Sequence, residues 1–344
     1  MIPILEAVPN FSEGRDRTVV DALVDAIEAH DVDVLDVSMD PDHHRSVITF
    51  IGMPRAVEEA LVAAAEVAIE RIDLRRHEGV HPRLGALDVC PVVPLHGLDM
   101  SDAVRSAHRV GAGIAELGVP VFWYGAAARE PGSGLAPLRR GGFEAFAGGW
   151  PTGRTPDLDA GRSAAHPTAG ITCVGARPVL LAWNVWVDEI ERETLVDIAR
   201  EIRERDGGMP GLRALALELP RQGGLQLSMN LEGVQARDPF DVFLRVERRV
   251  TANGGRITKT EVIGMIPDTL VFPAATHRLR LSDPDPVRML SSRVQRYALE
   301  RMESELQTMV DWILGAGSEV PNDIRDAARL VAGRSTPQST AEDA

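Results

Sequence analysis

Apolar runs of strand length alternate with segments of helical spacing along the first 125 residues, and this alternation restricts the fold more than any other feature. In the helical segments apolar residues recur every three or four positions, as on one face of an amphipathic helix. Alternation of this kind is typical of an α/β or α+β fold. Strands are predicted at 2–9, 32–38, 46–52, 86–95 and 119–125, and helices at 15–29, 54–72 and 101–117.

A second unit with the same mixture of elements is predicted from about residue 176 onward. Asp188 is expected to cap its first helix. The preceding residues 129–170 contain many glycines, prolines and arginines, which predicts a long functional loop with one helical turn at 135–147. No sequence repeat relates the two units. The strands of the second unit are predicted at 177–187, 212–219, 224–231 and 256–266, and its second helix at 238–249.

The C-terminal region is predicted to be helical and then disordered. A long helix is expected to begin at Asp285-Pro286 and to end before Gly315, with an apolar stripe suited to packing or dimerisation. The last residues are rich in Ser, Thr, Pro and Gln, which favours disorder. The predicted boundaries are 1–175 and 176–284 for the two units, 285–332 for the helical extension and 333–344 for the tail.

Composition excludes several functional classes. A net charge of −14 and a pI near 5.1 argue against broad nucleic-acid binding, which needs a basic surface. No membrane span or signal peptide is expected, because long apolar runs and a basic N-terminal region are both missing. Cys90 and Cys173 cannot form a disulfide framework, which favours a reducing, cytoplasmic location.

Three polar clusters lie at predicted strand ends, where α/β proteins place their sites. The densest is the segment 77–85, HEGVHPRLG, and another is the segment 166–170, HPTAG. A further cluster consists of Asp40, Asp42, His43, His44 and Arg45. The sequence contains no motif for a serine nucleophile, a dinucleotide or a P-loop, so those sites have no support.

These clusters permit three interpretations. The first is solvated turns, because an isolated loop histidine is more often structural than catalytic. The second is a metal site, since His77 and His81 are four residues apart, although Gly79 and Pro82 disfavour the helix that this spacing requires. The third is an acid–base site, in which a histidine with a pKa of about 6.5 exchanges a proton and arginines hold carboxylates. The residues alone support a cleft for an anionic substrate with a histidine base, and they do not specify a reaction.

At these residues the sequence resembles the glutamate formimidoyltransferase family, whose animal members are fused to a cyclodeaminase. The matching segments follow the family's order and cover roughly residues 1–270. We expect a monofunctional member, because no cyclodeaminase sequence follows. The segments are EAVPNFSEGRD (6–16), LDVSMDPDHHRSVITFIG (35–52), RIDLRRHEGVHPRLGALDVCPVVPL (71–95), PVFWYGAAAR (120–129), HPTAGITCVGARPVLLAWNV (166–185), LQLSMNL (225–231) and EVIGMIP (261–267).

The resemblance implies an α/β (α+β) fold of two ferredoxin-like subdomains, with mixed sheets that face each other across a substrate groove, in a homodimer. It implies transfer of the formimidoyl group from N-formimidoyl-L-glutamate to N5 of tetrahydrofolate during histidine breakdown, which gives glutamate and 5-formimidoyltetrahydrofolate. The family's catalytic histidine falls on His81, which would take the proton from N5. Tetrahydrofolate acts as co-substrate, and no metal is expected.

Neighbouring residues receive roles from the same resemblance and from their chemistry. Arg45 is assigned to catalysis because it can hold a carboxylate or neutralise the intermediate, and Asp40 because it can orient a histidine or pair with the amidinium. The remaining candidates carry polar groups or open backbone that a substrate could contact. Substrate binding is predicted for Asn10, Ser12, Gly14, Asp42, His44, Arg83, Gly85, Thr168, Gly170 and Asn184.

Some positions depart from the family's usual residues, among them Ser38, His44 and the stretch PDLDAG at 156–161. These departures keep two alternatives open. One is a folate-dependent formyl- or amidine-transferase that acts on a different donor, and the other is a non-catalytic folate-binding homologue. The presence of His81 and Arg83 argues against the second alternative, because a pure binding protein needs no base.

Overall fold

The computed structural model describes residues 2–130, 134–233, 238–266, 268–279 and 290–315, with short pieces at 320–321, 324–325, 327–329 and 332. The chain divides into two compact units. One comprises Pro3–Ala275, and the other comprises Thr276–Ala344 together with Met1–Ile2. The unit Pro3–Ala275 contains two β-sheets, each with its own hydrophobic core.

The first sheet, called the N-terminal sheet below, begins with a βαββαβ repeat. Strand β2 (Asn10–Phe11) continues the line of the first strand, since both strands pair with β4 and β5. The strand order β3-β4-β1-β5 is that of a ferredoxin-like unit. The elements are β1 (Ile4–Ala7), α1 (Arg17–Glu28), β3 (Val32–Asp40), β4 (Arg45–Gly52), α2 (Pro54–Arg71), η1 (Leu74–Arg76) and β5 (Leu87–His96).

Two further strands extend this sheet beyond β5. Helix α3 (Met100–Glu116) leads to β6 (Val121–Gly125), and both β6 and β7 (Thr172–Ala176) run parallel to β5. The seven-stranded sheet is therefore mixed, as expected. The sequence analysis assigned no strand to β7, which follows the long loop. That loop contains two short helical pieces, α4 (Leu135–Leu138) and η2 (Phe143–Phe146), where one turn was expected.

The second sheet, called the C-terminal sheet, repeats the βαββαβ topology with the order β11-β8-β10-β9. All of its pairings are antiparallel, so the expectation of two mixed sheets was wrong for this one. Asp188 is the last residue of β8 and does not cap the next helix, whose N-cap is Glu191. The elements are β8 (Leu180–Asp188), α5 (Arg192–Ile202), η3 (Glu204–Asp206), β9 (Leu212–Glu218), β10 (Leu225–Glu232), α6 (Pro239–Ala252) and β11 (Arg256–Ile263).

Local sequence fixes the ends of the helices. The Asp16 side chain accepts a hydrogen bond from the Thr18 backbone N–H at the start of α1. Asp99 and Asp102 form a reciprocal capping box at the start of α3. Helix α2 begins with Pro54, whose fixed φ suits the first turn.

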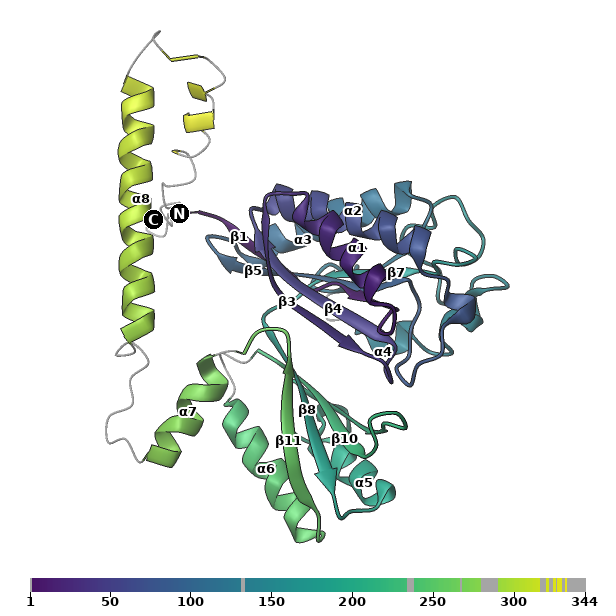
Figure 1. Cartoon of the computed structure of the whole chain (residues 1–344). Coiled ribbons are helices and arrows are strands. Elements are labelled where there is room, and N and C mark those ends of the chain that lie inside the picture. The colour runs from purple at the N-terminus through teal and green to yellow at the C-terminus, as the bar shows by residue number, and fades with distance from the viewer. Residues whose placement is uncertain are drawn as a thin grey trace, which may run out of the picture. The chain divides into compact units, whose positions relative to one another are not determined.

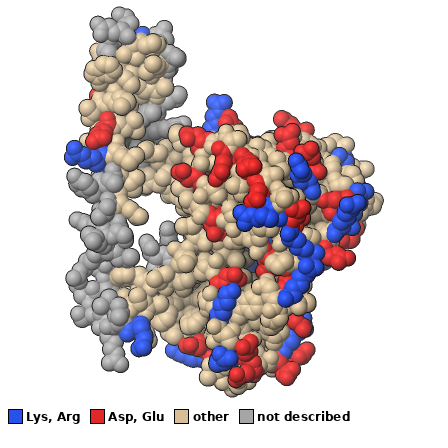
Figure 2. All heavy atoms as spheres, in the orientation of Figure 1, with Lys and Arg blue, Asp and Glu red and all other residues tan. Residues whose placement is uncertain are grey.

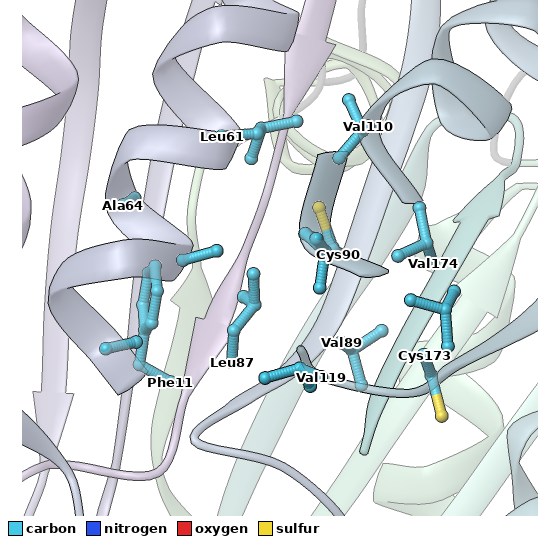
Figure 3. Close-up of a cluster of buried hydrophobic side chains, with 14 of the residues drawn as sticks. Phe11, Leu61, Ala64, Leu87, Val89, Cys90, Val110, Val119, Cys173 and Val174 are labelled. Carbon is cyan, nitrogen blue, oxygen red and sulfur yellow. The ribbon is translucent and has the colours of Figure 1, made fainter. Parts of the chain in front are cut away.

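Each sheet packs helices against one face, and the core lies between the two layers. Helices α1, α2 and α3 cover the N-terminal sheet, whereas α5 and α6 cover the C-terminal sheet (Figure 1). In the first core Phe11, Leu61 and Leu87 are almost completely buried (Figure 3). Truncation of such a phenylalanine to alanine typically costs about 3–5 kcal/mol. In the second core Trp183 stacks on Phe243, with 5.9 Å between ring centroids.

Helices α7 (Asp268–Leu279) and α8 (Leu290–Gly315) follow the second sheet. On α8, Val310 is buried, whereas Met302 and Met309 of the predicted stripe are more than half exposed. At least these two residues of the expected stripe are therefore not buried, whereas Leu306 and Ile313 are half-buried. The expected helix start at 285–286 and the tail 333–344 lie outside the described residues. No helix in the described part of the chain is long and apolar enough to cross a membrane.

Candidate active site

A cavity of about 350 Å³ lies between the uncovered faces of the two sheets, within Pro3–Ala275. Its walls follow from the two-residue period of the strands. On β8, Ala182 and Asn184 line the cavity, whereas Trp183 and Val185 point into the second core. A neighbouring cavity of about 340 Å³ shares lining residues with the first, including Arg177, so the two form one continuous groove.

His81 lies in the groove on the loop between η1 and β5. Its Nδ1 is 2.8 Å from the Pro82 carbonyl oxygen, a shorter contact than the 3.4 Å to the donor Arg45 Nη1, so the proton is assigned to Nδ1. The lone pair is then on Nε2, which has no hydrogen-bond partner among the described residues. The pKa of His81 lies well below its ordinary value of 6.5. Burial is the largest cause, and the guanidinium groups of Arg45 and Arg139 lower it further. His81 is therefore a neutral imidazole at neutral pH.

Asp88 is the centre of a buried charged cluster beside His81. Its carboxylate accepts hydrogen bonds from Arg45 Nη1 at 2.7 Å and from Arg139. Its other oxygen accepts the Leu84 backbone N–H at 2.7 Å, which ties down the loop that carries His81. Although burial raises the pKa of Asp88, the two guanidinium groups outweigh it, and the pKa lies well below its usual range.

The Asp88 cluster contains two cations and one anion, so it leaves an excess positive charge at the groove. Arg45 also donates from Nε to Asn10 Oδ1 at 2.9 Å, and its Nη1 lies 3.4 Å from His81 Nδ1. The side chains of Arg45 and Arg139 are only 11% and 13% exposed, so water screens them little. A carboxylate in the groove would be stabilised by this field.

A second cluster of side chains supports the loop between η1 and β5, which carries His81. His44 stacks on His77, with 4.3 Å between ring centroids, and Nε2 of His77 is 2.7 Å from the His44 carbonyl. His44 Nε2 is 3.2 Å from a carboxylate oxygen of Glu13, and its φ of 49° lies in the left-handed region. Burial lowers the pKa of His77 to about 4. These contacts fix the loop before β4 against the loop before β5.

Comparisons with known proteins agree with this arrangement. Residues 4–177, which span the whole N-terminal sheet, match the formiminotransferase domain, N-terminal subdomain. The chain belongs to this family. It is 35% identical over 291 residues to a glutamate formimidoyltransferase of Streptococcus pyogenes serotype M1, which covers 83% of this chain and 96% of that protein.

Further relatives extend the match beyond the N-terminal sheet. A glutamate formimidoyltransferase of Thermoplasma acidophilum is 36% identical over 305 residues, covering 86% of this chain and 98% of that protein. A formimidoyltransferase-cyclodeaminase of Sus scrofa is 35% identical over 314 residues, but the match covers only 57% of that longer protein. This chain is therefore a transferase of the formiminotransferase family.

The predicted site residues of this family member divide into two groups. One group lines the cavity and consists of Asn10, Asp40, Arg45, His81 and Asn184. The other group lies outside the cavity lining and supports the surrounding loops. It consists of Ser12, Gly14, Asp42, His44, Arg83, Gly85, Thr168 and Gly170.

The contacts of the second group show what these residues do in the loops around the cavity. Ser12 Oγ donates to the Gly85 carbonyl at 2.7 Å, and Arg83 pairs with Glu144 at 2.8 Å. Thr168 belongs to a turn in which His166 Nδ1 accepts backbone N–H groups. Gly170 has φ +72°, and a Cβ there would lie 1.9 Å from the Leu84 carbonyl oxygen. These residues build the frame of the loop that carries His81.

Asp42 connects the two sheets. Its two carboxylate oxygens accept the backbone N–H groups of Arg221 and Gln222 at 2.9 and 3.0 Å, in the turn between β9 and β10. Gln222 Nε2 also donates to Asp40 Oδ2 at 3.0 Å. Asp42 is only 3% exposed, and both of its oxygens are occupied by this turn. The hydrogen bonds of Asp42 with the β9–β10 turn thus join the two sheets at one end of the groove, and they are called the latch below.

Sequence reasoning missed several groove residues. Asp88 stands in the apolar run ALDVCPVV, where a buried carboxylate was itself a signal. Arg139 lies on the long loop, and nothing local indicates that it reaches Asp88. His43 was noted in its cluster but not selected, and Glu261 was assigned only to a strand. All four residues belong to the groove or its charged centre.

The remaining candidate chemistries have little support in the described part of the chain. No group of three or more His, Cys, Asp or Glu side chains there is arranged to hold a metal ion. Both cysteines are free and buried. Burial raises the pKa of the Cys173 thiol to about 12 and also raises that of Cys90, so neither presents a thiolate nucleophile.

Proposed function

We propose that this chain transfers a formimidoyl group from N-formimidoyl-L-glutamate to N5 of tetrahydrofolate. The observation that carries the proposal is the neutral His81, with its free Nε2 in a groove beside the positive Asp88 cluster. The names of the relatives support the same reaction class. Tetrahydrofolate and formimidoylglutamate both carry carboxylates, which suits the excess positive charge of the Asp88 cluster.

The reaction needs one new bond, one broken bond and a base. N5 of tetrahydrofolate attacks the formimidoyl carbon of the donor amidinium, and His81 Nε2 accepts the proton from N5 as the N5–C bond forms. The tetrahedral intermediate then collapses, the bond between this carbon and the glutamate nitrogen breaks, and the glutamate nitrogen leaves as an amine after gaining a proton. The product cation is the amidinium of 5-formimidoyltetrahydrofolate.

The surroundings of His81 suit this role. A histidine of ordinary pKa is partly protonated near neutral pH and is then no base. Arg45 and Arg139 destabilise the imidazolium of His81, so the unprotonated form predominates before the substrate binds. General-base catalysis typically contributes about 10²–10⁴-fold in rate, and the two walls of the groove add orientation of the reactants.

A turnover assay tests the proposal. Purified protein is mixed with tetrahydrofolate and either formimidoylglutamate or formylglutamate, and the folate product is followed by its absorbance. Formation of 5-formimidoyltetrahydrofolate with one equivalent of glutamate is expected. Turnover of the formyl donor alone would replace the proposed donor, and binding of tetrahydrofolate without turnover of either donor would contradict transfer altogether.

We also propose that the protein is a cytoplasmic homodimer that acts in histidine breakdown. The unpaired, buried cysteines suit a reducing compartment. Met302, Met309 and Trp312 on α8 are 55%, 58% and 68% exposed, an apolar surface that a second copy could cover. A chain truncated after residue 284 should then be monomeric in light scattering, and an unchanged dimer would assign the interface elsewhere.

A further inference from the structure

One wall of the groove presents three hydrogen-bond acceptors, and His43 and Glu261 among them have no role so far. We propose that His43, Asp40 and Glu261 form a subsite for the cationic amidinium of the donor and thereby select formimidoyl over formyl donors. The inference rests on the proposed function and names the residues that would set its donor specificity. All three residues line the same cavity as His81.

His43 supplies an acceptor that has no partner. The residue is only 9% exposed, and its Nε2 makes no hydrogen bond within the described chain. Asp40 accepts the His43 backbone N–H at 2.8 Å, and its Oδ2 lies 3.8 Å from His43 Nδ1. This carboxylate favours the proton on Nδ1, so Nε2 is left as an unpaired acceptor on a residue that lines the cavity. An unsatisfied buried polar atom destabilises the structure, and an N–H donor on a ligand would relieve that cost.

The charged groups around His43 keep its imidazole in the acceptor form. Burial is the main cause that lowers its pKa, and Arg45 lowers it further. Asp40, Asp42 and Glu261 act in the opposite direction. The pKa nevertheless stays below 6.5, so His43 is neutral at neutral pH and can accept a hydrogen bond.

The position of His43 suits a contact close to the reacting carbon. The centroids of the His43 and His81 rings are 6.0 Å apart, with the rings in an edge-to-face arrangement. The two rings are therefore neighbours in the wall of the groove, and a small planar group beside them can contact both. The formimidoyl carbon, whose nitrogens carry the amidinium charge, is such a group.

Asp40 and Glu261, one from each sheet, add carboxylate acceptors to the same wall of the groove. Asp40 lies at the end of β3, and Glu261 lies on β11 of the C-terminal sheet. The side-chain neighbours of the Asp40 carboxylate are an amide and an imidazole, and Glu261 forms a long ion pair with Lys259 at 4.0 Å. By contrast, Glu232 in the same groove pairs with Arg213 at 2.6 Å. Asp40 and Glu261 therefore retain negative charge for a cationic ligand.

Donor chemistry makes this wall selective. An amidinium carries a positive charge and presents only N–H donors at its two nitrogens. A formyl group presents an uncharged oxygen, whose lone pairs would face the acceptors of His43, Asp40 and Glu261. Sites whose buried polar groups are left unpaired by an analogue reject it strongly. The wall therefore favours formimidoylglutamate and penalises formylglutamate.

The subsite is tested by comparing how tightly the wild type and matched variants bind the formimidoyl and the formyl donor. The dissociation constants of formimidoylglutamate and formylglutamate are measured by calorimetry, and kcat/KM is measured where turnover occurs. The wild type should bind the formimidoyl donor about 100-fold more tightly, since each charge-assisted hydrogen bond adds roughly 10-fold or more. Glu261→Gln and His43→Phe should each reduce this preference about 10-fold, chiefly through weaker binding of formimidoylglutamate.

Glu218→Gln provides the control, because it makes the same chemical change on an exposed residue of β9 that does not line the groove. It should leave the preference unchanged. Equal binding of the two donors by the wild type would overturn the subsite, as would an unchanged preference in both Glu261→Gln and His43→Phe. A retained binding preference without turnover would support the subsite while overturning the proposed transfer, so the two claims fail separately.

Discussion

The N-terminal and C-terminal sheets share one topology but contribute differently to the groove. The N-terminal sheet carries His81 and the buried Asp88 cluster, whereas the C-terminal sheet contributes mostly neutral and acidic side chains, such as Asn184 and Glu261. Beyond the shared repeat, the N-terminal sheet has two added strands and the long loop that brings Arg139 to Asp88. The comparison teaches that each βαββαβ repeat supplies one wall of the groove, and that the extension of the N-terminal sheet adds a second cation, Arg139, to the Asp88 cluster.

The charge pattern of the surface fits the same view. Basic and acidic side chains are interspersed on the face shown in Figure 2. The net charge of the chain is −14, yet the buried Asp88 cluster carries an excess positive charge. Burial makes this local charge count more than the exposed charges, which solvent and salt screen. An acidic protein can thus attract anionic substrates to one groove.

Removal of the Asp88 carboxylate should have the largest effect, and it tests the contribution of the N-terminal sheet. Asp88→Asn leaves Arg45 and Arg139 without their counter-charge in a buried site, which typically costs about 3–5 kcal/mol. Urea unfolding should show this loss, together with a collapse of transfer activity. Asp33→Asn on the exposed side of β3 serves as control, and equal stability of the two variants would refute the structural role of Asp88.

Removal of the cation that the long loop supplies should produce a smaller, pH-dependent effect. Because the base works only above its pKa, loss of a nearby cation raises the pKa of His81 and moves the acid limb of kcat/KM to higher pH. The acid limb of kcat/KM in Arg139→Gln should therefore lie about one pH unit above that of the wild type, with similar rates on the plateau. An acid limb at the wild-type pH would show that the loop does not tune the base.

Loss of the latch between the sheets should have the smallest of these effects. Asp42→Ala removes the acceptor of two backbone N–H groups in the β9–β10 turn, at a cost of about 1–3 kcal/mol. Because the latch closes one end of the groove, we expect KM to rise several-fold and kcat to change little. Hydrogen exchange at Arg221 and Gln222 should increase in the variant, and unchanged protection would show that the turn is held by other contacts.

The regular parts of the fold could be predicted from local sequence. Apolar periodicity located most of the strands and the main helices of both sheets, because burial of one face imposes a period on the sequence. The capping error at Asp188 arose because its side chain type suits both a strand end and an N-cap. The topological repeat could be expected only from the family resemblance, since a shared strand order needs no shared residues.

The site was less predictable because it depends on distant contacts. His81 and Arg45 stood in dense polar motifs, and both line the groove. Arg139 meets Asp88 across 51 positions of sequence, and Asp42 meets Gln222 across 180. No local pattern encodes such pairs. Residues such as His44 and Ser12 shared the motif of the groove residues, yet their side chains face the supporting loops.

The pH dependence of transfer in the wild type and in His81→Gln tests the central claim most directly. Formation of the folate product from formimidoylglutamate would be measured between about pH 5 and 9, with His30→Gln as a control outside the groove. We predict wild-type kcat/KM that stays level as pH falls through about 6.5, and a loss of about 10²–10⁴-fold in His81→Gln alone. A wild-type rate that falls at or above pH 6.5, or a His81→Gln variant that retains the wild-type rate, would contradict the assignment of His81 as a neutral general base.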